Sequence, residues 1–161
     1  MKITSIFCIT LLCGILFISE CSAKNQTFIA QKLVVQIELT PFQKKHQNPY
    51  FSLWLSNKNK EHKTLVVLRE KVKWLRDLKK FWRNIARENR SESDAVTGAT
   101  NKRKNFNYTF EIDTIWQDIS LEVVRENGHR ELIYLPISTS KECVKGNVEI
   151  VKICVQLIIT E

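Results

Sequence analysis

Short runs in which apolar and polar residues alternate recur along the chain, and they restrict its fold more than any other feature. In residues 33–39, Leu-Val-Val-Gln-Ile-Glu-Leu, one face carries Val35, Ile37 and Leu39, and residues 106–112 alternate in the same way. A period of two is typical of a strand with one buried face. Aromatic or β-branched residues predict further strands over 50–55, 64–68, 119–124, 131–135 and 148–160.

One segment departs from this pattern. Between residues 74 and 85 the apolar residues recur at intervals of three and four, which predicts an amphipathic helix whose other face is basic. A basic helix that bears tryptophans can lie on a membrane surface. We favour packing against the core instead, because a chain of this size needs the apolar area to close its fold.

The turns between the strands indicate the fold class. Asn127-Gly128 between two strand-like runs is a strong hairpin signal because both residues accept positive φ, and Gly146-Asn147 marks a further turn. About seven strands without alternating strand–helix units predict a mainly β fold. We expect an immunoglobulin-like antiparallel β-sandwich with one inserted amphipathic helix.

The first 23 residues have the three parts of a secretory signal peptide. Lys2 is followed by an apolar run over residues 6–18 and by the small-residue cleavage site Cys21-Ser22-Ala23. The run is shorter than the roughly 20 residues of a spanning helix. We predict cleavage after Ala23, which leaves residues 24–161 as a single extracytoplasmic β-sandwich domain without a transmembrane segment.

Charge and cysteine content describe the exported part further. It keeps two of the five cysteines, Cys143 and Cys154, and an oxidising compartment permits a disulfide. Two separate thiols are the alternative, since sequence spacing does not determine geometry. The net charge of +8 favours an anionic partner. Nucleic acid is not expected, because the protein is exported and carries no recognition motif for it.

Residues suited to conventional catalysis are scarce. The three histidines His46, His62 and His129 are isolated from one another and from any cysteine pair, so we predict no metal site. Neither a nucleophile elbow, a phosphate-binding glycine loop nor a dinucleotide fingerprint occurs. These absences argue against a conventional hydrolase or dehydrogenase, and we assign no catalytic residue.

Residues 94–100, Asp-Ala-Val-Thr-Gly-Ala-Thr, combine hydroxyls, small neighbours and a nearby acid. Gly98 and Ala99 leave the backbone open, so another protein could reach the Thr100 hydroxyl. Asp94 could orient the loop or help to position a metal-bound donor. Thr97 offers a second hydroxyl for local hydrogen bonds.

Three cations follow directly and would compensate a phosphate on that threonine: Lys102, Arg103 and Lys104. The same composition also suits a plain turn between a helix and a strand. From physical chemistry alone the plain turn is the favoured interpretation.

The seven residues resemble the Asp-x-x-Ser/Thr-Gly-Ala-Thr signal of FMN-binding domains in sodium-pumping NADH:quinone reductase and Rnf-type complexes. There, a Mg-dependent FMN transferase joins the FMN phosphate to the final threonine. The resemblance implies covalent FMN on Thr100 and an FMN transferase as partner. Trp74, Trp82 and Trp116 are candidates to stack on the flavin ring, although each also suits the core.

A second resemblance covers almost the whole exported chain. Its order and spacing resemble the predicted periplasmic proteins of domain of unknown function 2271, through residues 49–55, 73–78 with Phe81-Trp82, 94–100 and 121–126. That family is implied to be a small β-sandwich, often encoded near an FMN transferase and membrane-bound flavin and iron-handling redox proteins.

Together the resemblances lead to one functional hypothesis and one alternative. The first is a periplasmic electron-transfer module that carries FMN on Thr100 and works with a membrane-bound redox protein. The alternative is a cofactor-free binding or accessory module that docks to a membrane redox or iron-handling protein through its basic helix. Both describe a carrier or accessory protein rather than a stand-alone enzyme.

Overall fold

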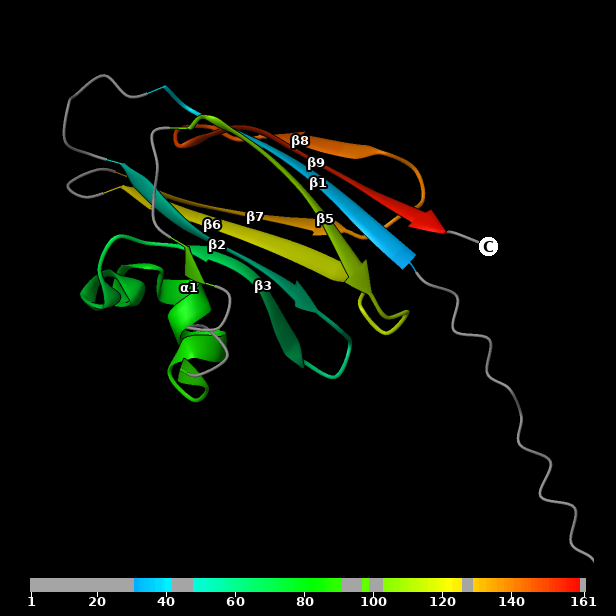
Figure 1. Cartoon of the computed structure of the whole chain (residues 1–161), viewed down its shortest axis with the longest axis horizontal. Helices are drawn as coiled ribbons and strands as arrows, with labels where there is room; N and C mark the ends of the chain where they lie inside the picture. The colour runs from blue at the N-terminus through cyan, green and yellow to red at the C-terminus, as the bar shows by residue number, and fades with distance from the viewer. Residues whose placement is uncertain (1–30, 42–47, 91–96, 99–102, 126–128, 160–161) are drawn as a thin grey trace, which may run out of the picture.

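The computed structural model describes residues 31–41, 48–90, 97–98, 103–125 and 129–159. Within these ranges, nine strands form two sheets that pack face to face (Figure 1). The signal peptide predicted for residues 1–23 lies outside the described residues. The prediction of a mainly β sandwich is confirmed.

The four-stranded sheet has the order β5-β1-β9-β8 and the five-stranded sheet the order β4-β3-β2-β6-β7. Neighbouring strands are antiparallel except β4, which pairs parallel to β3. The strands of the first sheet are β1 (Gln31–Leu39), β5 (Asn105–Ile112), β8 (Glu142–Lys145) and β9 (Ile150–Ile159). Those of the second are β2 (Pro49–Ser56), β3 (His62–Leu68), β4 (Thr97–Gly98), β6 (Asp118–Arg125) and β7 (Arg130–Pro136).

The strand order agrees in part with that of the immunoglobulin fold, but β8 lies beyond the position of A and no described strand lies in the position of D beside β5. In that fold, strands A, B, E and D form one sheet, and C, F and G form the other, which C′ can extend. Here β1 pairs with β5 as B does with E, and β3-β2-β6-β7 follow the order C′-C-F-G. Strand β9 lies in the position of A, although it comes last in the chain. The helical segment lies between the strands that correspond to C′ and E.

The main core fills the space between the two sheets. Val35, Ile37 and Leu39 on β1 are buried, as the alternation predicts. They meet inward-facing residues of β2 and β6, among them Phe51, Leu53, Leu55, Ile119, Leu121 and Val123. The burial of both inner faces holds the sandwich together.

The helical segment packs on the outer face of the five-stranded sheet (Figure 1). The amphipathic helix predicted over residues 74–85 is present as a helical segment that is not continuous. The chain forms three short pieces: the 3₁₀ helix η1 (Val72–Asp77), α1 (Lys79–Phe81) and the π-helix η2 (Trp82–Ala86). The predicted apolar face is nevertheless buried, as Leu75, Leu78, Phe81 and Ile85 pack against β2 and β3.

A side chain distant in sequence explains the break. Leu78 has φ −74° and ψ 74°, which is not helical. The helix restarts after it because Glu122 of β6 accepts the N–H groups of Lys80 and Phe81, at 3.0 and 2.8 Å to Oε2. These donors lack partners in the first turn of a helix, and a carboxylate there is favourable.

Strand β8 was not predicted, because all four of its residues are exposed and show no alternation. It pairs with β9 in a register that places Cys143 directly opposite Cys154. These two cysteines, which the sequence left open as bonded or separate, form a disulfide.

Candidate functional site

The centre of the 94–100 motif lies at the edge of the five-stranded sheet. Thr97 and Gly98 form β4, which pairs with Val67 and Leu68 of β3. The other motif residues, Asp94, Ala99 and Thr100, lie outside the described residues, as does Lys102. The backbone of the motif is therefore anchored at its Thr-Gly pair.

The motif leads from one sheet to the other. Arg103 and Lys104 are exposed and precede β5, the edge strand of the four-stranded sheet. The Lys104 carbonyl accepts the N–H of Leu39 at 2.8 Å, which fixes the start of β5 against the end of β1. The two cations are thus held at the beginning of the strand that follows the motif.

Arg103 interacts electrostatically with a tyrosine in an aromatic row on β5. Burial raises the pKa of Tyr108, and the guanidinium of Arg103 partly offsets this rise. Tyr108 stacks between Phe106 and Phe110, with ring centroids 6.3 and 5.6 Å apart. An arginine just before β5 and an aromatic row on β5 therefore lie close to each other.

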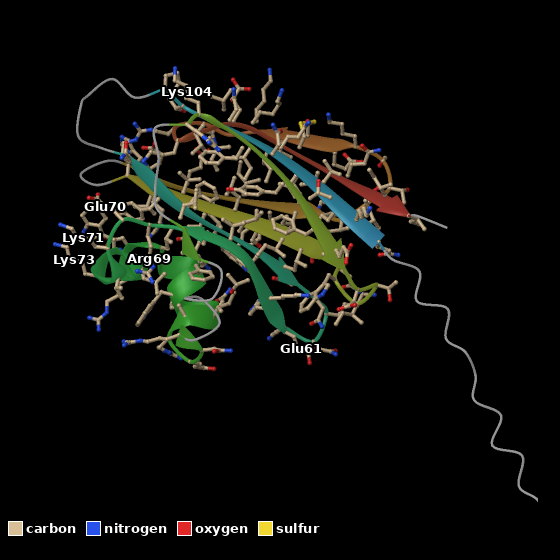
Figure 2. All side chains as sticks on the ribbon, viewed as in Figure 1. Glu61, Arg69, Glu70, Lys71, Lys73 and Lys104 are labelled. Atoms are coloured by element: carbon tan, nitrogen blue, oxygen red, sulfur yellow. A yellow bond between two sulfur atoms is a disulfide. The ribbon has the colours of Figure 1, made fainter. Side chains whose placement is uncertain are left out.

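A further cation near the motif was missed in the sequence. Arg69 directly follows Leu68, the pairing partner of Gly98, and it is 7% exposed. Figure 2 shows it at the end of β3 beside Lys71 and Lys73. Its position immediately after an apolar strand was the available signal in the sequence, but that position alone does not indicate burial.

The helical segment contains a surface pocket of about 380 Å³ lined by basic and apolar side chains. The guanidinium carbons of Arg76 and Arg90 each lie 5.5 Å from the centroid of the Trp82 ring. Such cation–π contacts hold both guanidinium groups against the aromatic ring. The other residues of the lining are Val72, Lys73 and Leu75. Both this pocket and β4 adjoin β3, since η2 contacts that strand.

The other two candidate tryptophans differ in position. Trp74 stacks on Tyr50 at 5.8 Å, so one face of its ring is already covered. Trp116 lies between β5 and β6, next to Gln117, whose N–H donates to the carbonyl of Ser56. Ser56 is the last residue of β2. The β3 residues that pair with the motif lie opposite the start of β2, at the other end of that strand. Trp116 is therefore distant from the motif.

The family model described as predicted periplasmic protein (DUF2271) matches residues 32–152. The chain belongs to this family. The family description states a periplasmic location and no activity. No curated protein and no solved structure matches the chain.

Nearly all features described above lie within the family domain, because the matched range runs from β1 into β9. Within the described ranges, no helix has the length and apolar character needed to cross a membrane. The same part of the chain contains no group of three or more His, Cys, Asp or Glu side chains suited to a metal ion.

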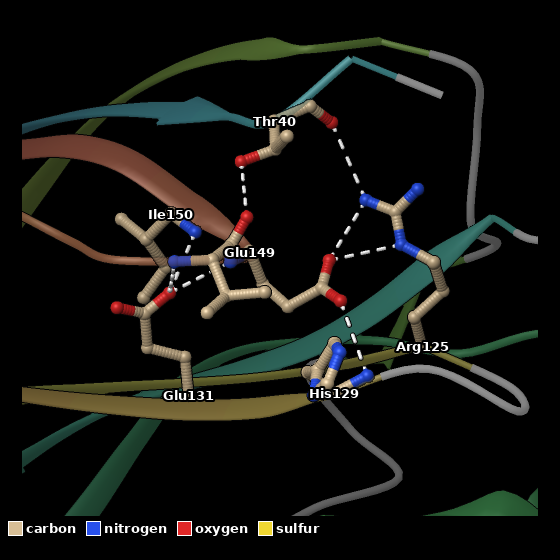
Figure 3. Close-up of polar contacts among 7 residues, drawn as sticks. Thr40, Arg125, His129, Glu131, Glu149 and Ile150 are labelled. Atoms are coloured by element: carbon tan, nitrogen blue, oxygen red, sulfur yellow. Dashed lines mark hydrogen bonds and ion pairs between the residues drawn. The ribbon is translucent and has the colours of Figure 1, made fainter. Parts of the chain in front are cut away.

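A polar network closes the motif end of the sandwich (Figure 3). Arg125 at the end of β6 pairs with Glu149, with Nη2 2.8 Å from Oε2, and their side chains are only 12% and 5% exposed. Arg125 also donates to the carbonyl of Thr40 at 3.3 Å. The pair thus connects the five-stranded sheet with β1 and with the turn before β9.

Glu131 on β7 fixes the same turn. Its carboxylate accepts four backbone N–H groups, from Asn147, Val148, Glu149 and Ile150, at 2.5 to 3.1 Å. Partial burial raises its pKa, but the four hydrogen bonds outweigh this and leave the pKa below its ordinary value. All of its acceptor capacity is directed at the turn, so we assign it a structural role.

Proposed function

We propose that the chain is a periplasmic electron-transfer module that carries FMN in phosphoester linkage on Thr100 and works with a membrane-bound redox system. The motif agrees with the covalent attachment signal at every specified position. The observation that carries the proposal is the anchoring of Thr97 and Gly98 on the outermost strand of a sheet. An edge strand leaves one side open to a modifying enzyme such as an FMN transferase.

The surrounding residues suit an anionic, aromatic group. Arg103 and Lys104 follow the motif in sequence, and Arg69 follows the residue that pairs with Gly98, so all three would favour a phosphate on the motif. The pocket with Trp82, Arg76 and Arg90 offers an aromatic face and two guanidinium groups. When bound, the flavin would supply the redox chemistry, while these residues would position it and influence its potential.

Intact mass after co-expression with an FMN transferase tests the proposal. We expect a mass increase equal to FMN minus water in the wild-type chain and none in Thr100→Ala. Thr109→Ala removes an exposed threonine from β5 and serves as the matched control, which should retain the flavin. Retained flavin in Thr100→Ala, or an unmodified wild type with a transferase active on a known acceptor, would contradict the proposal.

A distinct observation favours the alternative function, a cofactor-free accessory module that docks to a membrane redox or iron-handling protein. Residues 69–90 contain nine Lys or Arg and three Asp or Glu, and so carry a net charge of +6, against +8 for the whole chain. Their apolar side is buried against the sheet, so the basic side is the part available for a partner. A purified protein without visible flavin absorption, whose partner binding is lost at high salt, would support this function.

A further inference from the structure

The outer face of the four-stranded sheet carries a group suited to thiol chemistry, the Cys143–Cys154 disulfide. Cys154 on β9 is 3% exposed. Cys143 is exposed, as is every other residue of the edge strand β8. An incoming thiolate therefore has access to the Cys143 half of the bond, and Cys154 is the half that would leave.

A lysine is held where the leaving thiolate would form. Gln36 of β1 lies directly opposite Cys154 in the β1–β9 pairing. The ammonium of Lys141 donates to Oε1 of Gln36 at 2.9 Å. Lys141, Gln36 and Cys154 line the same small cavity of about 70 Å³. A nearby cation stabilises a thiolate and makes it a better leaving group.

Two more lysines surround the disulfide on the same sheet. Lys145 and Lys152 lie directly opposite each other, each two residues from a cysteine and hence on the same face as it. Like charges in directly opposed positions destabilise a strand pair. Glu38, opposite Lys152 on β1, offsets part of this charge. The opposed lysines stabilise the strand pairing poorly, but they raise the positive electrostatic potential at both sulfur atoms.

Opening the bond would leave the core intact. Strand β8 contributes no residue to the main core, whereas Ile150, Ile153 and Val155 of β9 remain buried against β1 and the opposite sheet. The disulfide joins β8 to a strand that β1 already holds along nine residue pairs. The sandwich can therefore persist with two free thiols.

We propose that Cys143–Cys154 is a redox-active disulfide that exchanges electrons with an external dithiol protein. A partner thiolate attacks Sγ of Cys143, the S–S bond breaks, and Cys154 leaves as a thiolate beside Lys141. The second partner thiolate then attacks the partner's sulfur in the mixed disulfide and releases Cys143. Two electrons and two protons pass to the pair, and the partner becomes a disulfide. This exchange does not depend on the proposed flavin.

Alkylation under native conditions tests the proposal, with dithiothreitol as the probe. The oxidised mature chain is incubated without denaturant, quenched with acid and alkylated with N-ethylmaleimide, and its mass is followed with time. We expect two alkyl groups to appear while the far-ultraviolet circular dichroism stays native. Alkylation that occurs only in denaturant, or a loss of the native spectrum on reduction, would overturn the proposal.

Matched variants separate redox activity from structural support. Lys141→Met should slow the reduction roughly threefold, because one nearby charge favours the leaving thiolate by a modest Coulomb energy in a solvated site. Lys58→Met removes an exposed lysine from the opposite sheet's β2–β3 turn and should leave the rate unchanged. The double variant Cys143→Ser with Cys154→Ser should keep the native spectrum. Equal slowing in both lysine variants, or an unfolded double variant, would contradict the proposal.

Discussion

The substitution Glu131→Gln tests how the turn between β8 and β9 is held. The Glu131 carboxylate accepts four backbone N–H groups, one on Oε1 and three on Oε2. A glutamine amide has one acceptor oxygen, so its NH₂ group must face at least one of these donors. The variant therefore loses one hydrogen bond and converts the other three from charge-assisted to neutral bonds.

The size of the effect follows from these bonds. A charge-assisted hydrogen bond contributes about 1.5–3 kcal/mol and a neutral one about 0.5–1.5 kcal/mol. Glu131 is half-buried, so water screens the interaction and can replace part of what is lost. We expect the free energy of unfolding near pH 7 to fall by about 2 kcal/mol.

The lowered pKa of Glu131 determines how the stability difference between wild type and variant changes with pH. Folding lowers the pKa of Glu131 from its ordinary 4.5, because its backbone hydrogen bonds outweigh burial. The carboxylate therefore stabilises the fold at pH values above 4.5, and this contribution is lost as the pH falls through the lowered pKa. The difference between wild type and variant should be largest near neutral pH and shrink in acid.

Urea unfolding of both proteins at about pH 7 and about pH 3 measures the difference. Glu111→Gln changes an exposed glutamate on β5 and should stay within about 0.5 kcal/mol of wild type. A Glu131→Gln variant as stable as this control near pH 7, or a deficit that grows in acid, would refute the reasoning.

Three further substitutions test the same framework. Gly146→Ala would place a Cβ in a clash with the carbonyl oxygen of Ile150, so we expect a loss of about 1–3 kcal/mol in urea unfolding. Arg125→Ala leaves the buried Glu149 carboxylate without its cation and should cost about 3–5 kcal/mol by the same measurement. Burial raises the pKa of Glu122, an effect that hydrogen bonds from the helical segment only partly offset. The contribution of Glu122 to the free energy of unfolding therefore declines as the pH rises from 4.5 through the raised pKa. Glu122→Gln should remove that decline when the free energy of unfolding is compared across this range.

The strands were predictable where one face is buried and the other is not. The alternation in β1 and β5 located both strands to within two residues, because burial on one face leaves a period of two in the sequence. Strand β8 has no such period because it lies at a sheet edge with all its residues exposed. Its pairing depends on the turn that Glu131 holds, and no local pattern indicates that contact.

The helical segment was also only partly predictable from local sequence. Its apolar spacing correctly predicted the buried face, but not the interruption at Leu78. That interruption depends on Glu122, which lies 41 residues beyond Phe81. The motif at 94–100 was found from its composition, whereas the burial of Arg69, which follows the residue that pairs with Gly98, could not be predicted because no local pattern indicates it.

Peptide mapping tests the central claim most directly. Trypsin cleaves after Arg90 and Lys102 and releases residues 91–102, which contain Thr100 and three other hydroxyl side chains. After co-expression with an FMN transferase, fragmentation of this peptide should locate a mass increment of FMN minus water on Thr100. An unmodified peptide from cells in which the transferase modifies a known acceptor, or an increment on another residue, would contradict the assignment of Thr100 as a flavin carrier.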